Sequence, residues 1–370
     1  MKKIITTAIC TVAILTMFAG CSKKETAMSA QNGSKEYHLV GDILVEEGET
    51  LNVSENAWNK DYVSSVKYAK KTGKDLLLFF NTNDPLTVEF KNNVTSTKEF
   101  INKYSKDYVL VDVDFTYPID EDDAANSQIG IDYRVRSFPS IYFVTNEGFV
   151  LDVVEIVSDN INDMQAFNER YELAEQTMTL VKEAISNVKA TEGVDRASAI
   201  DTLLTTVKTP TDDLLVLEKE IATLDPKNQT GLVGKYIIFE ALQEAYDIAY
   251  TGDANDNGEN AKKAASVIVK AAKNKMVDAD LKQNAYYQAA YLLATSSNPD
   301  YKTVISYLNK SYKASKKSEN AQSILQTIND VKKMQKELKN QSKNSAKETS
   351  SEENTSAPET TEQSSQEVTQ

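Results

Sequence analysis

Residues 135–144 read VRSFPSIYFV, and this stretch decides the fold of the region around it. Its last four residues, Ile141 to Val144, have the length and composition of a buried strand. The turn Asn146-Glu147-Gly148 follows, and residues 149–157 form a second apolar run. Two such runs joined by a short turn that contains glycine are typical of an antiparallel hairpin. The stretch therefore predicts the closing hairpin of a β-sheet.

Upstream of the hairpin, strand and helix patterns alternate. Residues 76–80 and 108–115 are apolar runs of strand length. Residues 58–69 and 88–104 carry apolar side chains at helical spacing, and Gly73 supplies a stop for the first of these helices. Strands that are separated by helices and closed by a hairpin favour a mixed α/β sheet.

The order of these segments resembles the thioredoxin-like domains of bacterial envelope proteins. The resemblance is carried by Trp58 before an Ala-Lys-Lys-Thr-Gly-Lys helix end, by the segment Val94-Thr-Ser-Thr-Lys-Glu-Phe100, and by the Val-x-Val-Asp pattern in the second strand. It extends through the stretch quoted above. It implies that residues 36–158 form a thioredoxin-like domain and that Pro139 is the cis-proline of that family.

The resemblance also locates a missing active site. The family's usual interval before Val94 places its Cys-x-x-Cys redox pair on Asp84-Pro85-Leu86-Thr87, where neither cysteine is present. Thiol-disulfide exchange requires a thiolate nucleophile and a resolving sulfur. We therefore expect a redox-inactive domain, with no catalytic residue, no cofactor and no enzymatic activity of its own.

A peptide groove is what the resemblance still implies. In the family, the backbone before the cis-proline lies beside the active-site turn and pairs with extended peptide, a form of strand addition. The candidate groove residues are Asp84, Pro85, Thr87, Arg136, Phe138 and Pro139. The alternative is that Phe138 packs in the core and Pro139 only shapes the fold.

The N-terminus predicts export. Two lysines precede the apolar residues 4–18, a pattern typical of a secretory signal peptide and too short for a membrane-spanning helix, which needs about 20 apolar residues. The sequence Phe18-Ala-Gly-Cys21 resembles the lipobox of bacterial lipoproteins, with Phe18 where Leu is commonest. An ordinary cleaved signal with an incidental cysteine is the alternative.

The lipobox resemblance implies an anchored protein of the cell envelope. Residues 1–20 would be removed, the sulfur of Cys21 would carry lipid, and residues 21–35 would form a flexible tether to a bacterial membrane. Since Cys10 leaves with the signal, the mature chain would hold no free thiol.

Composition excludes several function classes. The chain has two Cys and one His, which are too few for a zinc site of such ligands, and the single His38 is predicted to be a surface residue. A formal net charge of −14 argues against nucleic acid as a partner, because such proteins normally present a basic face.

Residues 160–340 predict an all-α domain of helical repeats. Residues 300–312 resemble the second helix of a tetratricopeptide repeat. The stripe expected to bury the first helix is Leu173, Thr177, Leu180, Val181, Ala184, Ile185 and Val188. The tyrosines that could line a concave partner surface, or only pack between helices, are Tyr236, Tyr246, Tyr250, Tyr286, Tyr287, Tyr291, Tyr301, Tyr307 and Tyr312.

Two segments of the C-terminal half invite other interpretations. Residues 253–258 match the opening of a calcium loop, but Ala264 occupies the twelfth position, where a bidentate Glu is required. A plain polar connection between helices is therefore expected, with no metal. Residues 341–370 are dominated by Ser, Thr, Glu and Gln and predict a disordered acidic tail.

Together these patterns predict a membrane-anchored module that binds or scaffolds a protein or peptide partner. One alternative is an accessory component of an envelope thiol-disulfide or protein-maturation system. Another is a purely structural surface lipoprotein.

Overall fold

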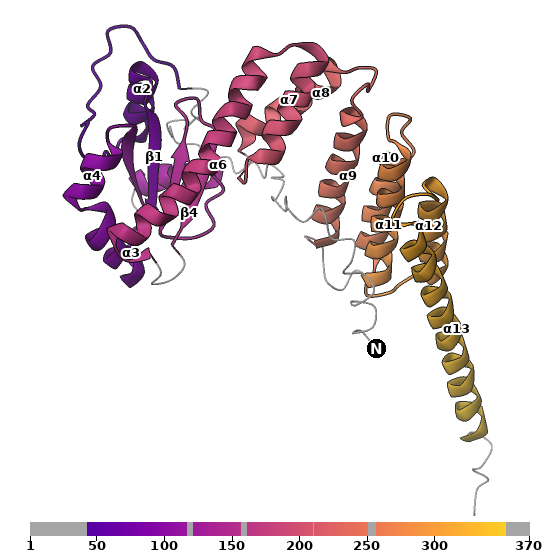
Figure 1. The fold of residues 1–370 in the computed structure, drawn as a ribbon. Coiled ribbons are helices and arrows are strands. Elements are labelled where there is room, and N and C mark those ends of the chain that lie inside the picture. The colour runs from indigo at the N-terminus through magenta and orange to yellow at the C-terminus, as the bar shows by residue number, and fades with distance from the viewer. Residues whose placement is uncertain (1–42, 117–120, 157–160, 210, 251–256, 353–370) are drawn as a thin grey trace, which may run out of the picture. The chain divides into compact units, whose positions relative to one another are not determined.

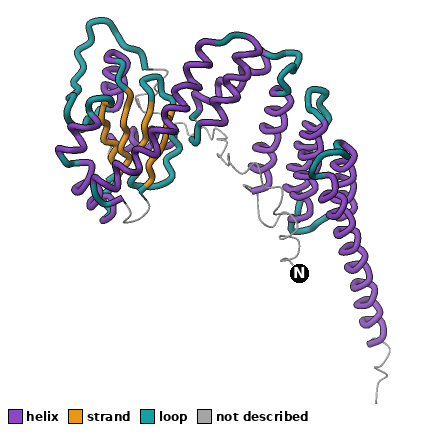
Figure 2. The backbone as a smooth tube through the Cα atoms, in the orientation of Figure 1, coloured by secondary structure: helices purple, strands orange, loops and turns teal. Residues whose placement is uncertain are grey.

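The computed structural model describes residues 43–116, 121–156, 161–209, 211–250 and 257–352. They fall into two compact units that divide between Val233 and Gly234. We call the described residues before the division the sheet unit and those after it the helical unit, and Figures 1 and 2 show the elements of each.

The predicted N-terminal features lie outside the described residues. These are the signal peptide, the lipobox with Cys21, the tether and His38.

A small mixed sheet forms the centre of the sheet unit. Its strands are β1 (Asp75–Asn81), β2 (Tyr108–Asp114), β3 (Ser140–Val144) and β4 (Val150–Glu155). Their order is β2-β1-β3-β4, with β1 and β2 parallel and the other neighbours antiparallel. The predicted α/β sheet and its closing hairpin are therefore confirmed.

Helices cover both faces of this sheet. One face holds α2 (Tyr62–Thr72) and α5 (Glu121–Asp132); the other holds α3 (Pro85–Phe90), a π-helical turn (Lys91–Thr95), α4 (Lys98–Tyr104) and α6 (Met164–Ala190). Helix α2 begins at Asp61, whose side chain accepts the Ser64 N–H, and ends at Gly73 in the left-handed conformation, as its position in the sequence predicts.

The prediction of one continuous helix over residues 88–104 is wrong. The segment is divided among α3, the π-helical turn and α4. The reason is local: the Thr97 hydroxyl accepts the Phe100 N–H at 3.1 Å, which starts a new helix at that point.

The boundary predicted between residues 158 and 160 differs from the observed division. Helices α6, α7 (Gly193–Thr206) and α8 (Asp212–Leu224) belong to the sheet unit. Phe167 of α6 is completely buried, with its ring 5.2 Å from that of Phe100 and 5.5 Å from that of Tyr104. Helix α6 therefore packs on the sheet layer, and the division falls after α8, between Val233 and Gly234.

The burial of α6 also differs from the predicted stripe. Leu173 and Leu180 are 60% and 57% exposed. The buried side chains are Phe167, Ala174, Met178, Val181, Ala184, Ile185 and Val188. The N-terminal half of the helix therefore turns a different face inward, because it packs on the aromatic sheet layer.

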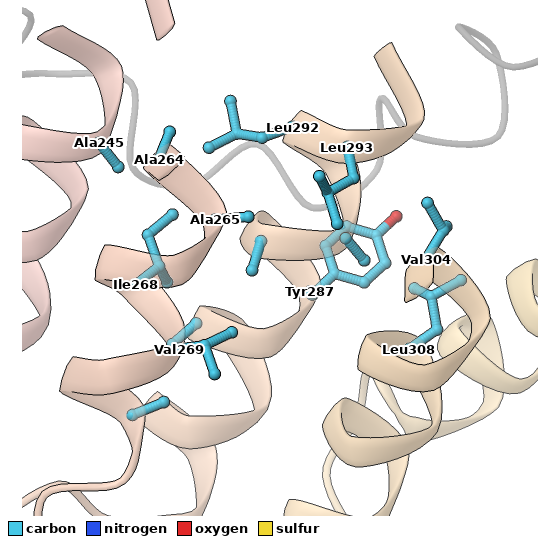
Figure 3. Close-up of a cluster of buried hydrophobic side chains, with 14 of the residues drawn as sticks. Ala245, Ala264, Ala265, Ile268, Val269, Tyr287, Leu292, Leu293, Val304 and Leu308 are labelled. Carbon is cyan, nitrogen blue, oxygen red and sulfur yellow. The ribbon is translucent and has the colours of Figure 1, made fainter. Parts of the chain in front are cut away.

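The helical unit contains five helices within the described residues. They are α9 (Leu232–Tyr250), α10 (Glu259–Ala272), α11 (Ala279–Thr295), α12 (Tyr301–Ala314) and α13 (Ala321–Glu352). Their shared core is built from small and branched aliphatic side chains, as Figure 3 shows for Ala264, Ala265, Ile268, Leu292 and Leu308. Alanine at so many buried positions permits a close approach of neighbouring helices.

One such approach involves the backbone itself. A Cβ atom added at Gly234 of α9 would lie 2.2 Å from the carbonyl oxygen of Met276, in the connection between α10 and α11. Glycine is the residue that fits this distance without a shift of the backbone.

The predicted disordered tail is partly wrong. Helix α13 continues to Glu352, so residues 341–352 are helical, while residues 353–370 lie outside the described part of the chain. Adding residues to an existing helix costs little, and Lys, Gln, Glu and Ala are good helix formers.

Candidate functional site

The strand register brings two loops together at one edge of the sheet. Phe80 near the end of β1 pairs with Ser140, the first residue of β3. Since the strands are antiparallel, the residues that follow β1 lie beside those that precede β3. The turn of residues 82–87 and the segment of residues 136–139 therefore meet, and we call this place the candidate groove.

The first wall of the candidate groove is organised by Asp84. Its side chain caps α3 by accepting the N–H groups of Leu86 and Thr87 at 2.9 and 3.1 Å. The same carboxylate accepts hydrogen bonds from the hydroxyls of Thr82 and Thr87. Pro85 fills the first helical position, where its missing N–H costs nothing.

These contacts control the charge of Asp84. Burial opposes ionisation and raises the pKa of the carboxyl group, but the hydroxyls of Thr82 and Thr87 and two backbone N–H groups outweigh it. The net result is a pKa below the ordinary value. Asp84 is therefore a carboxylate at neutral pH, and Thr87 is buried beside it.

The second wall is the segment before β3. The peptide bond between Phe138 and Pro139 is cis, the conformation that the family resemblance implies. Pro139 is buried and its carbonyl oxygen accepts the Ile156 N–H at 3.1 Å. Phe138 is 37% exposed and its ring lies 4.9 Å from that of Phe115, so it sits at the surface rather than within the core.

The backbone of this segment makes no hydrogen bond to any other described residue. No hydrogen bond within the described part of the chain involves Arg136, Ser137 or Phe138, on main chain or side chain. Arg136 is exposed, whereas the Ser137 hydroxyl is buried without a partner. Unpaired N–H and C=O groups beside a sheet form a template for another extended chain.

A buried polar cluster behind the groove was not anticipated. Asn81, 1% exposed, donates from its side-chain amide to Asp112 at 2.5 Å, and the Lys91 ammonium lies 3.3 Å from the same carboxylate. The cluster joins β1, β2 and the π-helical turn. The signal available in the sequence was an Asn that ends an apolar strand and an Asp between two valines.

The calcium-loop segment is largely outside the part of the chain that the structure describes. Residues 251–256, most of the calcium-loop candidate, lie outside the described residues, and Ala264 is buried in α10. No group of three or more His, Cys, Asp or Glu that could hold a metal ion occurs within the described residues. Among them there is also no helix with the length and apolar character needed to cross a bilayer.

The nine tyrosines named from the sequence differ in how far their side chains are exposed. Tyr236 and Tyr287 are buried, so for them the packing interpretation holds. Tyr246 and Tyr250 are exposed and stack with ring centroids 5.8 Å apart, and Lys310 lies over the ring of Tyr307.

Comparisons with known proteins give three results. A family described as "Uncharacterised protein C-terminal domain" matches residues 232–337, which begins at the first residue of α9. An uncharacterized protein of Treponema pallidum (strain Nichols) is 26% identical over 264 residues, which are 70% of this chain and 83% of that protein. A solved structure named "DsbH Oxidoreductase" is similar at 19% identity and a TM-score of 0.29, over 35% of this chain and 92% of its own.

Proposed function

We propose that this chain is a peptide- or protein-binding module of the bacterial cell envelope, built on a redox-inactive thioredoxin-like domain and anchored through lipid on Cys21. The observation that carries the proposal is the backbone of residues 136–138 beside the Asp84 turn, which makes no hydrogen bond within the described part of the chain. An extended ligand that pairs with these groups would gain main-chain hydrogen bonds at little cost to the fold.

The topology supports the thioredoxin-like part of the proposal. A parallel pair, β1 and β2, is followed by the antiparallel hairpin β3–β4. Helix α3 begins directly after β1 at the turn where the family carries its redox pair, and a cis-proline precedes β3. In the helical unit, Asp300 caps helix α12, and we propose a scaffolding role for this unit on the tetratricopeptide-like sequence of residues 300–312 alone.

The proposed function involves no bond-breaking chemistry. Asp84 and Thr87 supply oxygen atoms where exchange needs two sulfurs. We expect no reduction of insulin by the chain with dithiothreitol as electron donor. The double variant Asp84→Cys, Thr87→Cys is the positive control for the fold, because its two thiols would stand three residues apart at the start of α3. Turnover by the unaltered chain would favour the accessory oxidoreductase instead.

The binding test uses the whole chain in detergent and a library of nine-residue synthetic peptides read by fluorescence anisotropy. Phe138→Ala and Ser137→Pro should each weaken the best peptides at least tenfold at unchanged thermal stability, because the first removes the exposed ring and the second removes a backbone N–H of the segment. Leu173→Ala, which trims an exposed apolar side chain of α6, is the matched control and should leave binding unchanged. Binding that survives both groove variants would refute the proposal.

A further inference from the structure

The exposed side chains of residues 136–138 differ in chemistry. Arg136 presents a guanidinium and Phe138 an aromatic ring, and both are exposed, while the Ser137 hydroxyl between them is buried. This alternation matches an extended chain, in which residues two apart lie on the same side. A peptide that pairs with the segment therefore meets a cation and an apolar surface two residues apart.

The cation is available for a ligand. No acidic group lies within ion-pair distance of Arg136 among the described residues. Glu155 and Arg136 both act on Tyr142: burial raises the pKa of Tyr142, Glu155 raises it further, and Arg136 opposes the rise. Both charges thus act on one tyrosine without forming a pair with each other.

The Asp84 carboxylate of the opposite wall makes no ion pair with Arg136 in the described part of the chain. The Asp84 carboxylate is half-buried, and both of its oxygens already accept hydrogen bonds from the turn and from α3. Lys91, on the next turn of chain, is held by the buried Asp112. Arg136 is therefore the charged side chain of the candidate groove that has no partner in the described structure.

We infer that the candidate groove selects extended peptides that place an Asp or Glu side chain beside Arg136 and an apolar side chain two residues away beside Phe138. Guanidinium and carboxylate fit in a bidentate geometry, which makes Arg suited to this discrimination. Exposed charge pairs set specificity and association rate more than total affinity. The inference rests on the proposed function and adds the ligand class to it.

The test compares three peptides of one length and backbone: Glu paired with Leu two residues on, the same peptide with Lys for Glu, and the same peptide with Ser for Leu. The chain should bind the first about fivefold to tenfold more tightly than each of the others, and the preference over Lys should weaken between 50 and 500 mM salt.

Charge reversal supplies the decisive variant. Arg136→Glu should invert the order, so that the Lys peptide binds more tightly than the Glu peptide. Lys106→Glu makes the same change of charge at an exposed position before β2, at the opposite end of that strand from the groove, and should leave the order unchanged.

The outcomes separate the two proposals. Binding of all three peptides with equal affinity, or an order that Arg136→Glu leaves unchanged, overturns the ligand class while the groove stands. Binding of none of the peptides by the unaltered chain, with none from the wider library, overturns the groove itself. Loss of binding with Phe138→Ser at unchanged thermal stability supports both.

Discussion

The cores of the two units are built from different kinds of side chain. All of the bulkiest fully buried side chains among the described residues, such as Phe79, Phe100 and Phe143, lie in the sheet unit. The core of the helical unit combines branched aliphatic side chains with many alanines, including Ala264, Ala285 and Ala289, all less than 1% exposed. A core of large rings is sensitive to loss of volume, whereas closely approaching helices are sensitive to added volume. The comparison predicts which substitutions each unit tolerates.

The largest expected effect is loss of an aromatic ring. Phe167→Ala should destabilise the sheet unit by about 3–5 kcal/mol, because the cavity would form among the rings of Phe90, Phe100 and Tyr104. The measurement is urea unfolding followed by the fluorescence of Trp58, the single tryptophan, which stacks on Phe100 at 5.8 Å.

A surface change on the same helix gives the control. Leu173→Ala should alter the free energy of unfolding by no more than about 0.5 kcal/mol, since that side chain is 60% exposed. Circular dichroism reports the helices of both units, so only the step that coincides with the Trp58 transition should shift in Phe167→Ala. If the whole circular dichroism transition shifted with the Trp58 transition, the two units would not unfold independently and the comparison would fail.

An added methyl group should have the next largest effect. Gly234→Ala places a Cβ 2.2 Å from the Met276 carbonyl oxygen and should destabilise the helical unit by about 1–3 kcal/mol. The direction of the stability change tests the close approach, because without it alanine would stabilise a helix by about 1 kcal/mol over glycine. The shift should appear in the circular dichroism transition and leave the Trp58 transition in place.

The pH dependence of stability at Asp225 tests to which unit the loop after α8 belongs. Asp225 is fully buried and accepts the N–H groups of Gln229 and Thr230 and the Thr230 hydroxyl at 2.7 to 2.9 Å. Burial raises its pKa, but these hydrogen bonds bring the net pKa below the ordinary 3.8. The carboxylate therefore stabilises the fold fully above pH 3.8, and this contribution is lost as the pH falls through the lowered value.

Asp225→Asn should accordingly lower the melting temperature at pH 7 and differ progressively less from the unaltered chain below pH 3.8. Asp107→Asn is the control and should change little at either pH, because this exposed carboxylate makes no hydrogen bond to another described residue. A deficit seen in the circular dichroism transition but absent from the Trp58 transition would move the loop after α8 into the helical unit.

Much of the sheet unit could be predicted because its strands are short apolar runs between clear turns. The run at 76–80 became β1, and the quoted stretch became β3, the first strand of the closing hairpin, as expected. Helix α5 was not predicted, because its acidic segment EDDAANSQIGID has little apolar periodicity. The packing of α6 on the sheet was not predicted either, because periodicity shows that a helix has a buried face without showing what covers that face.

The candidate groove was predictable in part for a related reason. The resemblance located Asp84 and Pro139 in the sequence, yet no motif indicates that the backbone of 136–138 lacks hydrogen bonds to other described residues or that Phe138 is exposed. The cluster of Asn81, Lys91 and Asp112 depends on contacts between segments distant in the chain, which spacing alone does not reveal.

If the candidate groove binds peptide as proposed, the carboxylate at position 84 would make that binding independent of redox conditions. A thiol at this turn would exist in two oxidation states, and a ligand could be caught or released as the surroundings became more oxidising or more reducing. Asp84 has one state at any such potential, and its lowered pKa keeps that state throughout the neutral range. Whatever occupies the groove would thus be governed by its own concentration and by salt.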